Sequence, residues 1–193
     1  MTAAGDKGLL IVVSGPSGVG KSTVIGRLAE RNPVEFSVSV TTRAPRPGEV
    51  DGVHYHFIDE DRYAAMADQG DLLEWARYGG HGYGTPATPV REAVGEGKDV
   101  LLDIENDGAM QVKQRFPAAV TIFLLPPSED ALRARLEGRG DTTGEDLERR
   151  LAVVTEQIAH ARAHYDWLVV NEDLEQAVDE IVRILTVSRR IDA

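Results

Sequence analysis

The stretch LLIVVSGPSGVGKST, residues 9–23, decides the fold of this 193-residue chain. It opens with the apolar run Leu9–Val13, whose short length and β-branched residues are typical of a buried parallel strand. Residues 15–22 fit the pattern G-x-x-x-x-G-K-[ST], and Lys21 to Arg31 then reads as a helix. A strand, a glycine-rich turn and a helix in this order predict an α/β fold that binds a nucleoside triphosphate.

The glycine-rich loop is expected to hold the phosphates. Its glycines let backbone N–H groups turn towards phosphate oxygens, and the following helix presents its positive N-terminal end. Lys21 is expected to reach the β- and γ-phosphates, and Ser22 to offer its hydroxyl to Mg²⁺. The alternative is a chance glycine-rich turn, against which the flanking strand and helix argue. The predicted nucleotide-binding residues are Gly15, Pro16, Ser17, Gly18, Val19, Gly20, Lys21, Ser22 and Thr23.

Strands and helices alternate along the rest of the chain. Short apolar runs predict further buried strands at 99–104, 120–125 and 167–170. Amphipathic spacing and capping residues predict helices from Ser128 to Glu137, Asp146 to Tyr165 and Asp173 to Arg189, with Ser128 and Asp173 as caps. This alternation predicts a parallel-sheet phosphate-loop NTPase core with helices on both faces.

Two segments depart from that alternation. Residues 36–88 are rich in Gly, Tyr, Thr and Pro, and predict a small mixed-β insertion with one helix near Asp61–Gln69. The polar stretch 139–145 predicts a mobile lid. We therefore expect a single domain over 1–193. Its parts are a core at about 8–35, 89–126 and 160–193, the insertion at about 36–88 and a helical lid at about 127–159.

Composition limits the classes of partner. The net charge of −11 argues against non-specific binding to nucleic acid or anionic membranes, so arginines that bind anions must be concentrated locally. There is no cysteine, which excludes disulfides and thiol nucleophiles and fits a cytoplasmic location. No apolar run is long enough for a membrane span, Met1 to Lys7 is too polar for a signal peptide, and no obligatory protein partner is evident.

The blocks after the phosphate loop identify a family. SVSVTTRAPRPGEVDGVHYHF at 37–57 and LLEWARYGGHGYGT at 72–85, in order behind GPSGVGKST, closely resemble guanylate kinases. The resemblance extends over about residues 9–187. It implies a phosphotransferase that moves the γ-phosphoryl group of ATP, with Mg²⁺, onto GMP, and it leaves open whether dGMP is also a substrate.

Arg43 and Arg46 provide the expected local positive charge. They lie three residues apart in a proline-stiffened loop, and two guanidinium groups can fork onto one phosphate. Taken singly, such residues are more often solvated or structural, and only the ordered blocks favour a binding role. The resemblance implies that the GMP phosphate and its surroundings are contacted by Ser39, Arg43, Arg46, Tyr55 and Tyr83.

Glu74 is the expected guanine-recognition residue, with Thr85 beside it according to the resemblance. Guanine presents two adjacent donors, N1–H and N2–H₂, which one carboxylate can accept together, whereas adenine presents only one donor there. Glu105 is expected to contact guanine or metal-bound water. The family most often has Asp at that position, commonly an apolar residue at Asn106 and Gln at Asp107, so this stretch departs from the pattern.

The remaining predicted roles concern metal, lid and adenine. Asp103 ends an apolar strand and is expected to orient Mg²⁺ through water. The resemblance makes Arg139 and Arg150 the arginines that stabilise the transferring group, with Lys21 and Arg43 as further catalytic residues, and places Asn171 at adenine. Arg133, Arg135 and Arg149 are expected to form a solvated helix face. No third ligand accompanies either histidine pair, so a zinc site is not expected.

Two alternatives stay open beside guanylate kinase. One is a kinase for another nucleoside monophosphate, against which Glu74 and the TTRAPRPGE block argue. The other is a non-catalytic, peptide-binding domain of the guanylate kinase type. Such domains typically have a degraded phosphate loop, whereas Gly15, Gly20, Lys21 and Ser22 are intact here.

Overall fold

The computed structural model describes residues 7–137 and 144–191, which form an α/β fold of two compact units. The first unit comprises Met1–Leu10, Val34–Leu102 and Asp107–Ala119. The second comprises Ile11–Pro33, Asp103–Asn106 and Val120–Ala193. Each unit is described by itself.

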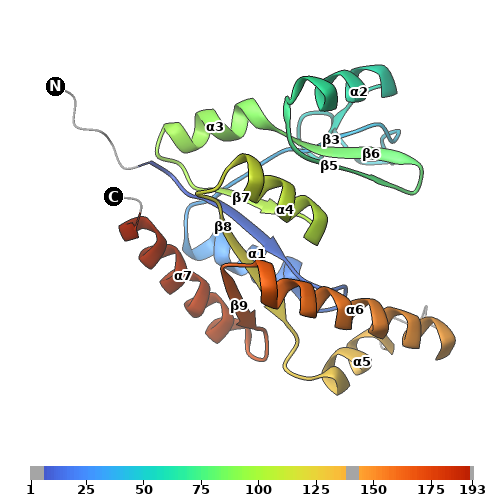
Figure 1. Cartoon of the computed structure of the whole chain (residues 1–193), viewed down its shortest axis with the longest axis vertical. Coiled ribbons are helices and arrows are strands. Elements are labelled where there is room, and N and C mark those ends of the chain that lie inside the picture. The colour runs from blue at the N-terminus through green and yellow to red at the C-terminus, as the bar shows by residue number, and fades with distance from the viewer. Residues whose placement is uncertain (1–6, 138–143, 192–193) are drawn as a thin grey trace. The chain divides into compact units, whose positions relative to one another are not determined.

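The helices and strands alternate as the sequence predicts over much of the chain (Figure 1). The strands are β1 (Leu10–Ser14), β2 (Glu35–Phe36), β3 (Val40–Thr41), β4 (His56–Phe57), β5 (Leu72–Tyr78), β6 (His81–Pro86), β7 (Val100–Asp103), β8 (Val120–Leu125) and β9 (Trp167–Val170). The helices are α1 (Lys21–Arg31), α2 (Glu60–Gln69), α3 (Ala87–Gly95), α4 (Asn106–Arg115), α5 (Glu129–Glu137), α6 (Gly144–His164) and α7 (Leu174–Ile191).

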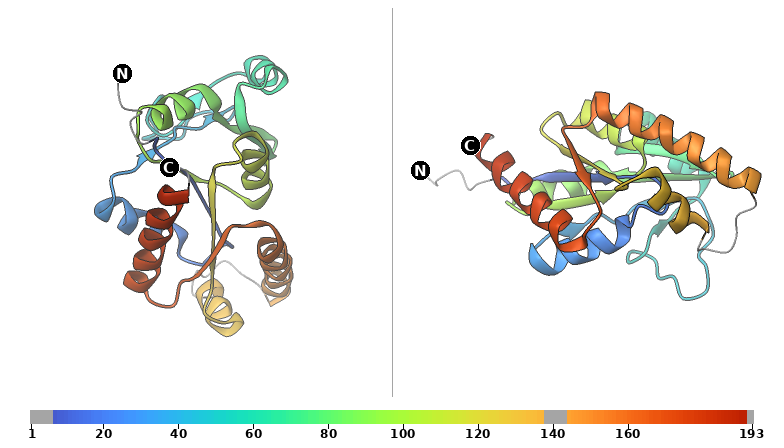
Figure 2. Two further views of the ribbon diagram at one scale, coloured as in Figure 1. Left: turned by 60° about the vertical axis from the view of Figure 1, so that its left-hand side comes forward. Right: turned by 90° about the horizontal axis from the view of Figure 1, so that it is seen from below.

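The second unit is built on three parallel strands in the order β1, β8, β9. Ile11 pairs with Val120, and Ile122 pairs with Trp167. Every residue of β1 is buried, because helices cover both faces of these strands. Helices α1 and α7 lie on one face and α6 on the other (Figure 2). The phosphate loop follows β1 directly, at the carboxyl end of that strand.

Side-chain caps fix two of the helices in this unit. The Ser128 hydroxyl accepts from the Ala131 N–H at 3.1 Å at the start of α5. The Asp173 carboxylate accepts from the Gln176 N–H at 2.9 Å at the start of α7. Each cap satisfies a backbone donor that has no partner within its own helix. Both predicted caps are confirmed.

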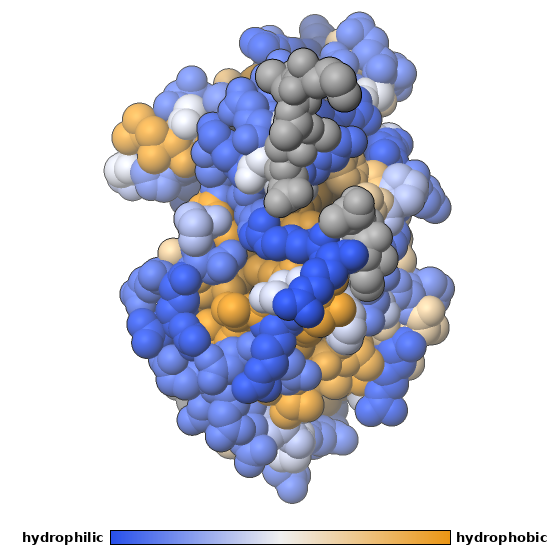
Figure 3. All heavy atoms as spheres, turned by 90° about the vertical axis from the view of Figure 1, so that its left-hand side faces the viewer, coloured by the Kyte–Doolittle hydropathy of each residue, from blue (hydrophilic) through white to orange (hydrophobic). Residues whose placement is uncertain are grey.

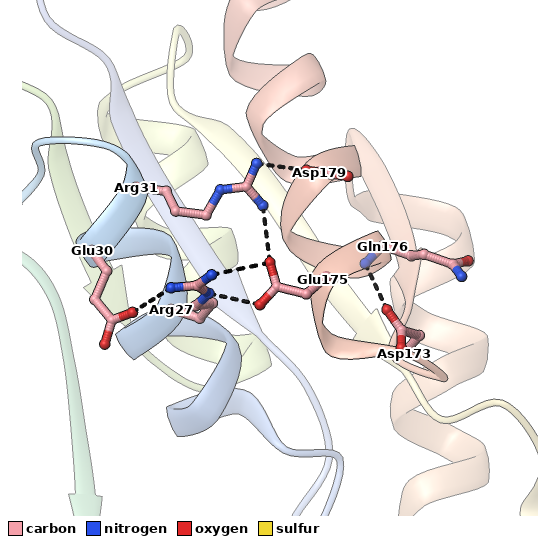
Figure 4. Close-up of polar contacts among 7 residues, drawn as sticks. All are labelled: Arg27, Glu30, Arg31, Asp173, Glu175, Gln176 and Asp179. Carbon is pink, nitrogen blue, oxygen red and sulfur yellow. Dashed lines mark hydrogen bonds and ion pairs between the residues drawn. The ribbon is translucent and has the colours of Figure 1, made fainter.

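Ion pairs join α1 to α7 across their exposed faces (Figure 4). The Glu175 carboxylate accepts from Arg27 Nε at 2.7 Å and from Arg31 Nη1 at 3.4 Å. Arg31 also donates to Asp179 at 2.6 Å, and Arg27 to Glu30 at 2.7 Å. The helix that follows the phosphate loop is therefore held to the C-terminal helix by a shared network rather than by isolated pairs.

The first unit contains a four-stranded mixed sheet in the order β4-β3-β6-β5. Strands β5 and β6 form an antiparallel hairpin in which Glu74 lies opposite Thr85. Tyr63 of α2 is buried against this sheet, and its hydroxyl donates to the backbone oxygens of Ala76 at 3.1 Å and Tyr83 at 3.2 Å. The same unit holds the parallel pair β2–β7. The predicted mixed-β segment and its helix are thus confirmed.

Two helices were not predicted. Helix α3 begins directly after Pro86, and α4 contains Gly108 near its start, so neither shows the uninterrupted pattern of the longer helices. The proposed division into core, insertion and lid stays a prediction. Most of the expected lid stretch 139–145 lies outside the described residues.

The surface is largely polar. Figure 3 shows hydrophilic residues over most of the face that it displays, as 32 acidic and 21 basic residues lead one to expect. Among the helices within 7–137 and 144–191, none combines the length and the apolar character that crossing a bilayer requires.

Candidate active site

The phosphate loop takes the backbone conformation that its glycines allow. Gly18 and Gly20 have φ of 83° and 95°, a region that other residues rarely adopt. Close packing favours glycine at position 15, because a Cβ there would lie 3.0 Å from Val19 Cγ1 and 3.1 Å from the Leu124 carbonyl oxygen. The loop therefore passes tightly over β8 before α1 begins at Lys21.

Two side chains of the same unit hold this loop through one carbonyl group. Asn171 Nδ2 donates to the Val19 oxygen at 2.8 Å, and Arg135 Nη1 donates to the same oxygen at 3.1 Å. Arg135 Nη2 also donates to the Asn171 oxygen at 3.3 Å. Placing Arg135 on a solvated helix face was therefore wrong. Asn171 is buried and supports the loop, while its contact with adenine stays a prediction.

Lys21 pairs with a carboxylate at the end of β7. Its Nζ lies 2.7 Å from Asp103 Oδ1 and 4.0 Å from Glu105 Oε1. Ser22 follows on the exposed side of the first turn of α1. The structure thus gathers the predicted phosphate lysine, the predicted metal-site hydroxyl and acid, and Glu105 within the second unit.

A cavity of about 660 Å³ opens above the loop within this unit. It is lined by Gly15, Pro16, Ser17, Gly18, Gly20, Lys21, Ser22, Thr23, Glu105, Asp146, Arg149, Arg150, Val153, Val154 and Gln157. Helix α6 supplies the wall that carries Arg150, whose role at the transferring group stays a prediction. Arg149, expected to be merely solvated, pairs with Asp146 at 3.3 Å on the same wall. The predicted residue Arg139 lies outside the described residues.

In the first unit, Arg43 is held by a carboxylate that the sequence analysis did not single out. Its Nη1 and Nη2 donate to the two carboxylate oxygens of Glu49 at 2.9 and 2.8 Å, and Nη1 also donates to the Ala44 oxygen at 2.7 Å. The Arg46 N–H donates to the same carboxylate at 2.6 Å. Hydrogen bonds from Arg43 and then from Arg46 lower the pKa of Glu49 to about 2.

Aromatic residues surround the Arg43 guanidinium. Its Cζ lies 5.5 Å from the centre of the Tyr55 ring and 5.9 Å from that of Phe57. The Tyr83 hydroxyl also interacts with Arg43, and the Tyr55 and Tyr83 rings meet edge to face at 6.1 Å. Cation–π contact of this kind holds a guanidinium in place without using its N–H donors.

Ser39 and Arg46, the other two residues predicted to contact the GMP phosphate, also belong to the first unit. Ser39 immediately precedes β3, and its backbone oxygen accepts from His56 N at 2.9 Å. Arg46 is exposed on the loop. Glu49 could have been found in advance, because a carboxylate three residues after one arginine and six after another can pair with both.

Glu74 is a buried carboxylate on β5, with 6% of its surface exposed. It accepts from the Thr85 hydroxyl at 2.7 Å. Burial raises the pKa of Glu74, and the hydrogen bonds from Thr85 oppose that rise only in part. A carboxylate kept in an apolar setting with one fixed neighbour has lone pairs left for further donors, as base recognition requires.

The histidines act as structural groups where the structure shows their contacts. His54 Nδ1 accepts from the Val50 N–H at 3.0 Å, and the His160 and His164 rings stack at 4.2 Å. Across the part of the chain that the structure describes, no group of three or more His, Asp or Glu side chains is placed to hold a metal ion.

The fold and the loop geometry define the class of protein. A glycine-rich loop between a buried parallel strand and a helix, with a lysine at the helix start, is the phosphate-binding site of the phosphate-loop NTPases. The sequence matches the family described as "Guanylate kinase" over residues 7–188. The chain belongs to the guanylate kinase family.

Individual relatives agree with this assignment. The chain is 50% identical to a guanylate kinase of Halalkalibacterium halodurans over 182 residues, covering 94% of this chain and 89% of the relative. It is 52% identical to one from Mycobacterium tuberculosis, covering 92% and 86%. The crystal structure of guanylate kinase from Anaplasma phagocytophilum is 34% identical and superposes with a TM-score of 0.72, covering 95% of this chain and 87% of that one.

Proposed function

We propose that this chain catalyses the reversible transfer of the γ-phosphoryl group of ATP to GMP, giving ADP and GDP. Its role would be in purine nucleotide metabolism and GMP recycling. The observation that carries the proposal is the buried Glu74–Thr85 pair, in a chain that also has an intact phosphate loop. Identity of about half the residues to curated guanylate kinases supports the same activity.

The donor nucleotide would bind in the second unit. Backbone N–H groups of residues 15–20 and the N-terminus of α1 would hold the phosphates, with Lys21 on the β- and γ-phosphates. Asn171 and Arg135 would preserve the loop by fixing the Val19 carbonyl group. Arg150, with Arg139, would stabilise negative charge that spreads over the transferring group.

The acceptor would bind in the first unit. Arg43 and Arg46 would fork onto the GMP phosphate, assisted by the hydroxyl groups of Ser39, Tyr55 and Tyr83. Glu74 would accept from guanine N1–H and N2–H₂ while Thr85 holds it in place. Because burial raises the free energy of an unpaired Glu74 carboxylate, a base that supplies two donors is favoured over one that supplies fewer.

The chemistry would be a displacement at phosphorus. An oxygen of the GMP phosphate forms a bond to the γ-phosphorus, and the bond between that phosphorus and the bridging oxygen of ADP breaks. The GMP phosphate is already deprotonated near neutral pH, so positioning and charge matter more than a base. Excluding water from the transfer prevents hydrolysis of ATP.

Mg²⁺ is part of this proposal. The Ser22 hydroxyl and, through water, Asp103 would hold it with the phosphates of ATP, and its charge would neutralise the developing phosphoryl charge. Oxygen donors of these two types suit Mg²⁺. Asp103 fits this role because its carboxylate lies 2.7 Å from Lys21 Nζ. It is therefore next to the side chain that would hold the β- and γ-phosphates. We also propose a cytoplasmic location, with which the cysteine-free sequence is compatible.

A coupled assay of ADP release tests the proposal. ATP and Mg²⁺ are supplied with GMP, dGMP, AMP, CMP or UMP in turn, with Lys21→Met as the inactive control. We expect turnover with GMP and, more slowly or equally, with dGMP. Turnover only with another monophosphate would overturn the role of Glu74. Binding of GMP without turnover with any acceptor would favour a non-catalytic binding domain.

A further inference from the structure

Asn106 directly follows Glu105, which lines the cavity above the phosphate loop, and it makes two side-chain contacts. Its Oδ1 accepts from the Tyr165 hydroxyl at 3.0 Å. Its Nδ2 donates, at the longer distance of 3.4 Å, to the backbone oxygen of Gln157. Both partners belong to α6 or directly follow it, and all three residues lie in the second unit.

The segment 103–106 is fixed at successive points by side chains of its own unit. Asp103 pairs with Lys21 Nζ at 2.7 Å, and the Ile104 oxygen accepts from the Ser14 hydroxyl at 2.7 Å. Asn106 provides the third attachment. Glu105 is left between two attachments, with its side chain largely exposed and lining the cavity. The position of Glu105 therefore depends on what holds the residues on either side of it.

The partners of Asn106 lie in the wall of the cavity or next to it. Gln157 lines the cavity together with Arg150, which lies two turns earlier on the same face of α6. Tyr165 is itself anchored, because its ring meets the buried Phe123 of β8 edge to face at 5.2 Å. Asn106 thus connects the acidic segment beside Lys21 to a helix end that is packed on the core sheet.

We propose that Asn106 is a positioning residue for the nucleoside triphosphate. It sets the separation between Glu105 on one side of the cavity and the Arg150-bearing face of α6 on the other. An amide suits this role because it accepts from a hydroxyl and donates to a carbonyl at the same time, which no apolar side chain can do. The inference rests on the proposed function of the cavity as the ATP site.

Two variants with a common readout test it. Asn106→Leu removes both hydrogen bonds while keeping the number and branching of the side-chain heavy atoms, and Tyr165→Phe removes only the hydroxyl while keeping the ring on Phe123. We expect each to raise the KM for ATP about threefold to tenfold, the loss expected for one or two hydrogen bonds, with the KM for GMP changed less than twofold. The double variant should show no more than the larger single effect, because both act on one contact.

Controls separate positioning from folding. Tyr78→Phe removes a hydroxyl from an exposed tyrosine, with 81% of its surface accessible, and should leave both KM values unchanged. An unchanged KM for ATP in both folded variants overturns the proposal, as does an equal rise of both KM values or a lowered Tm alone. If Asn106→Leu does not fold, Tyr165→Phe decides by itself. Failure of the proposed function is recognised separately, because the unaltered protein would then show no transfer of phosphate from ATP to GMP.

Discussion

At the scale of single residues, Glu74, which we propose binds guanine, lowers the stability of the folded chain when it is ionised. Its carboxylate is buried and bonded to Thr85, and burial raises its pKa. A carboxyl whose pKa is higher in the folded chain than in the unfolded one binds protons more tightly when folded. Its ionisation therefore lowers stability, fully so once the pH exceeds the folded-state pKa, and not at all below the unfolded value.

We expect Glu74→Gln to separate binding from stability. The variant should lower kcat/KM for GMP by about 30-fold or more, since roughly 2 kcal/mol of charged hydrogen bonding is lost. The same change should raise the Tm at a pH above the raised pKa of Glu74, where the buried carboxylate is charged. If both the activity and the Tm fell, the Glu74 carboxylate would stabilise the fold rather than recognise guanine.

The pH dependence follows from the same residue. As the pH falls through the raised pKa of Glu74, the protonated carboxyl becomes a donor and opposes the guanine donors. The KM for GMP should therefore rise towards acid pH in the unaltered protein. In Glu74→Gln this rise should be absent, and a parallel profile in the two proteins would assign the titration to another group.

Arg43 illustrates a different arrangement at the same scale. Glu49 occupies its Nη1 and Nη2 donors, and Tyr55 and Phe57 flank its plane. The Nε–H and the second Nη2–H lie on the other edge of the guanidinium, which is the edge suited to a forked contact with phosphate. Glu49 would therefore orient Arg43 rather than compete with the phosphate that we propose binds there.

Replacing Glu49 by Gln should disturb that orientation. We expect the KM for GMP to rise about tenfold, because a neutral amide cannot accept both guanidinium N–H groups, while the KM for ATP stays constant. Glu92→Gln, on the exposed face of α3, removes an equal charge away from this loop and serves as control. A lower KM for GMP in Glu49→Gln would show that the carboxylate competes with phosphate.

At the scale of elements, the link between α1 and α7 joins the helix that begins at Lys21 to the end of the chain. Glu175 is shared between Arg27 and Arg31, so removing it loosens several contacts together. Exposed ion pairs contribute little singly, and a network contributes more. Because these side chains are partly exposed, salt should screen much of the effect.

Glu175→Gln should therefore lower the Tm by about 2 °C or less at low salt. The difference from the unaltered protein should shrink as NaCl approaches about 1 M, where screening lengths are only a few ångströms. Glu180→Gln changes the same charge at an exposed position of α7 that takes no part in the ion pairs given above, and it should have a smaller effect. A loss in Glu175→Gln that persists at high salt would indicate packing rather than charge.

Elements also show what sequence can predict. The strands at 100–103 and 120–125 and the caps Ser128 and Asp173 follow from local patterns, because burial and capping are set by neighbours along the chain. The roles of Asn171, Arg135 and Asn106 could not be read this way. Their partners lie 152, 116 and 59 residues away, and only the folded chain brings them together.

At the scale of the whole molecule, the two compact units contain different proposed sites. The phosphate loop belongs to the second unit, and Arg43, Glu74 and their neighbours belong to the first. A ligand that binds only the native state suppresses the opening of the region that it contacts. Each substrate should therefore leave its own pattern of protection.

Hydrogen exchange followed by mass spectrometry tests this directly. GMP should slow exchange in peptides covering 39–57 and 72–85, and a non-hydrolysable ATP analogue should slow exchange over 15–23. If GMP alone protected 15–23 and had no effect at 72–85, the acceptor site would lie in the second unit, and our assignment to the first would be wrong. AMP should protect 72–85 less than GMP at the same concentration.

The Arg43–Glu49 contact also bears on inhibitor chemistry. Arg43, Arg46 and Glu49 together carry a single net positive charge, although the ligand proposed for them is a phosphate dianion. A guanine compound that carries a monoanionic group, such as a carboxylate or a tetrazole, would match that charge. Glu49 as an internal counter-ion would therefore let the proposed phosphate site in the first unit accept ligands with less charge than a nucleotide.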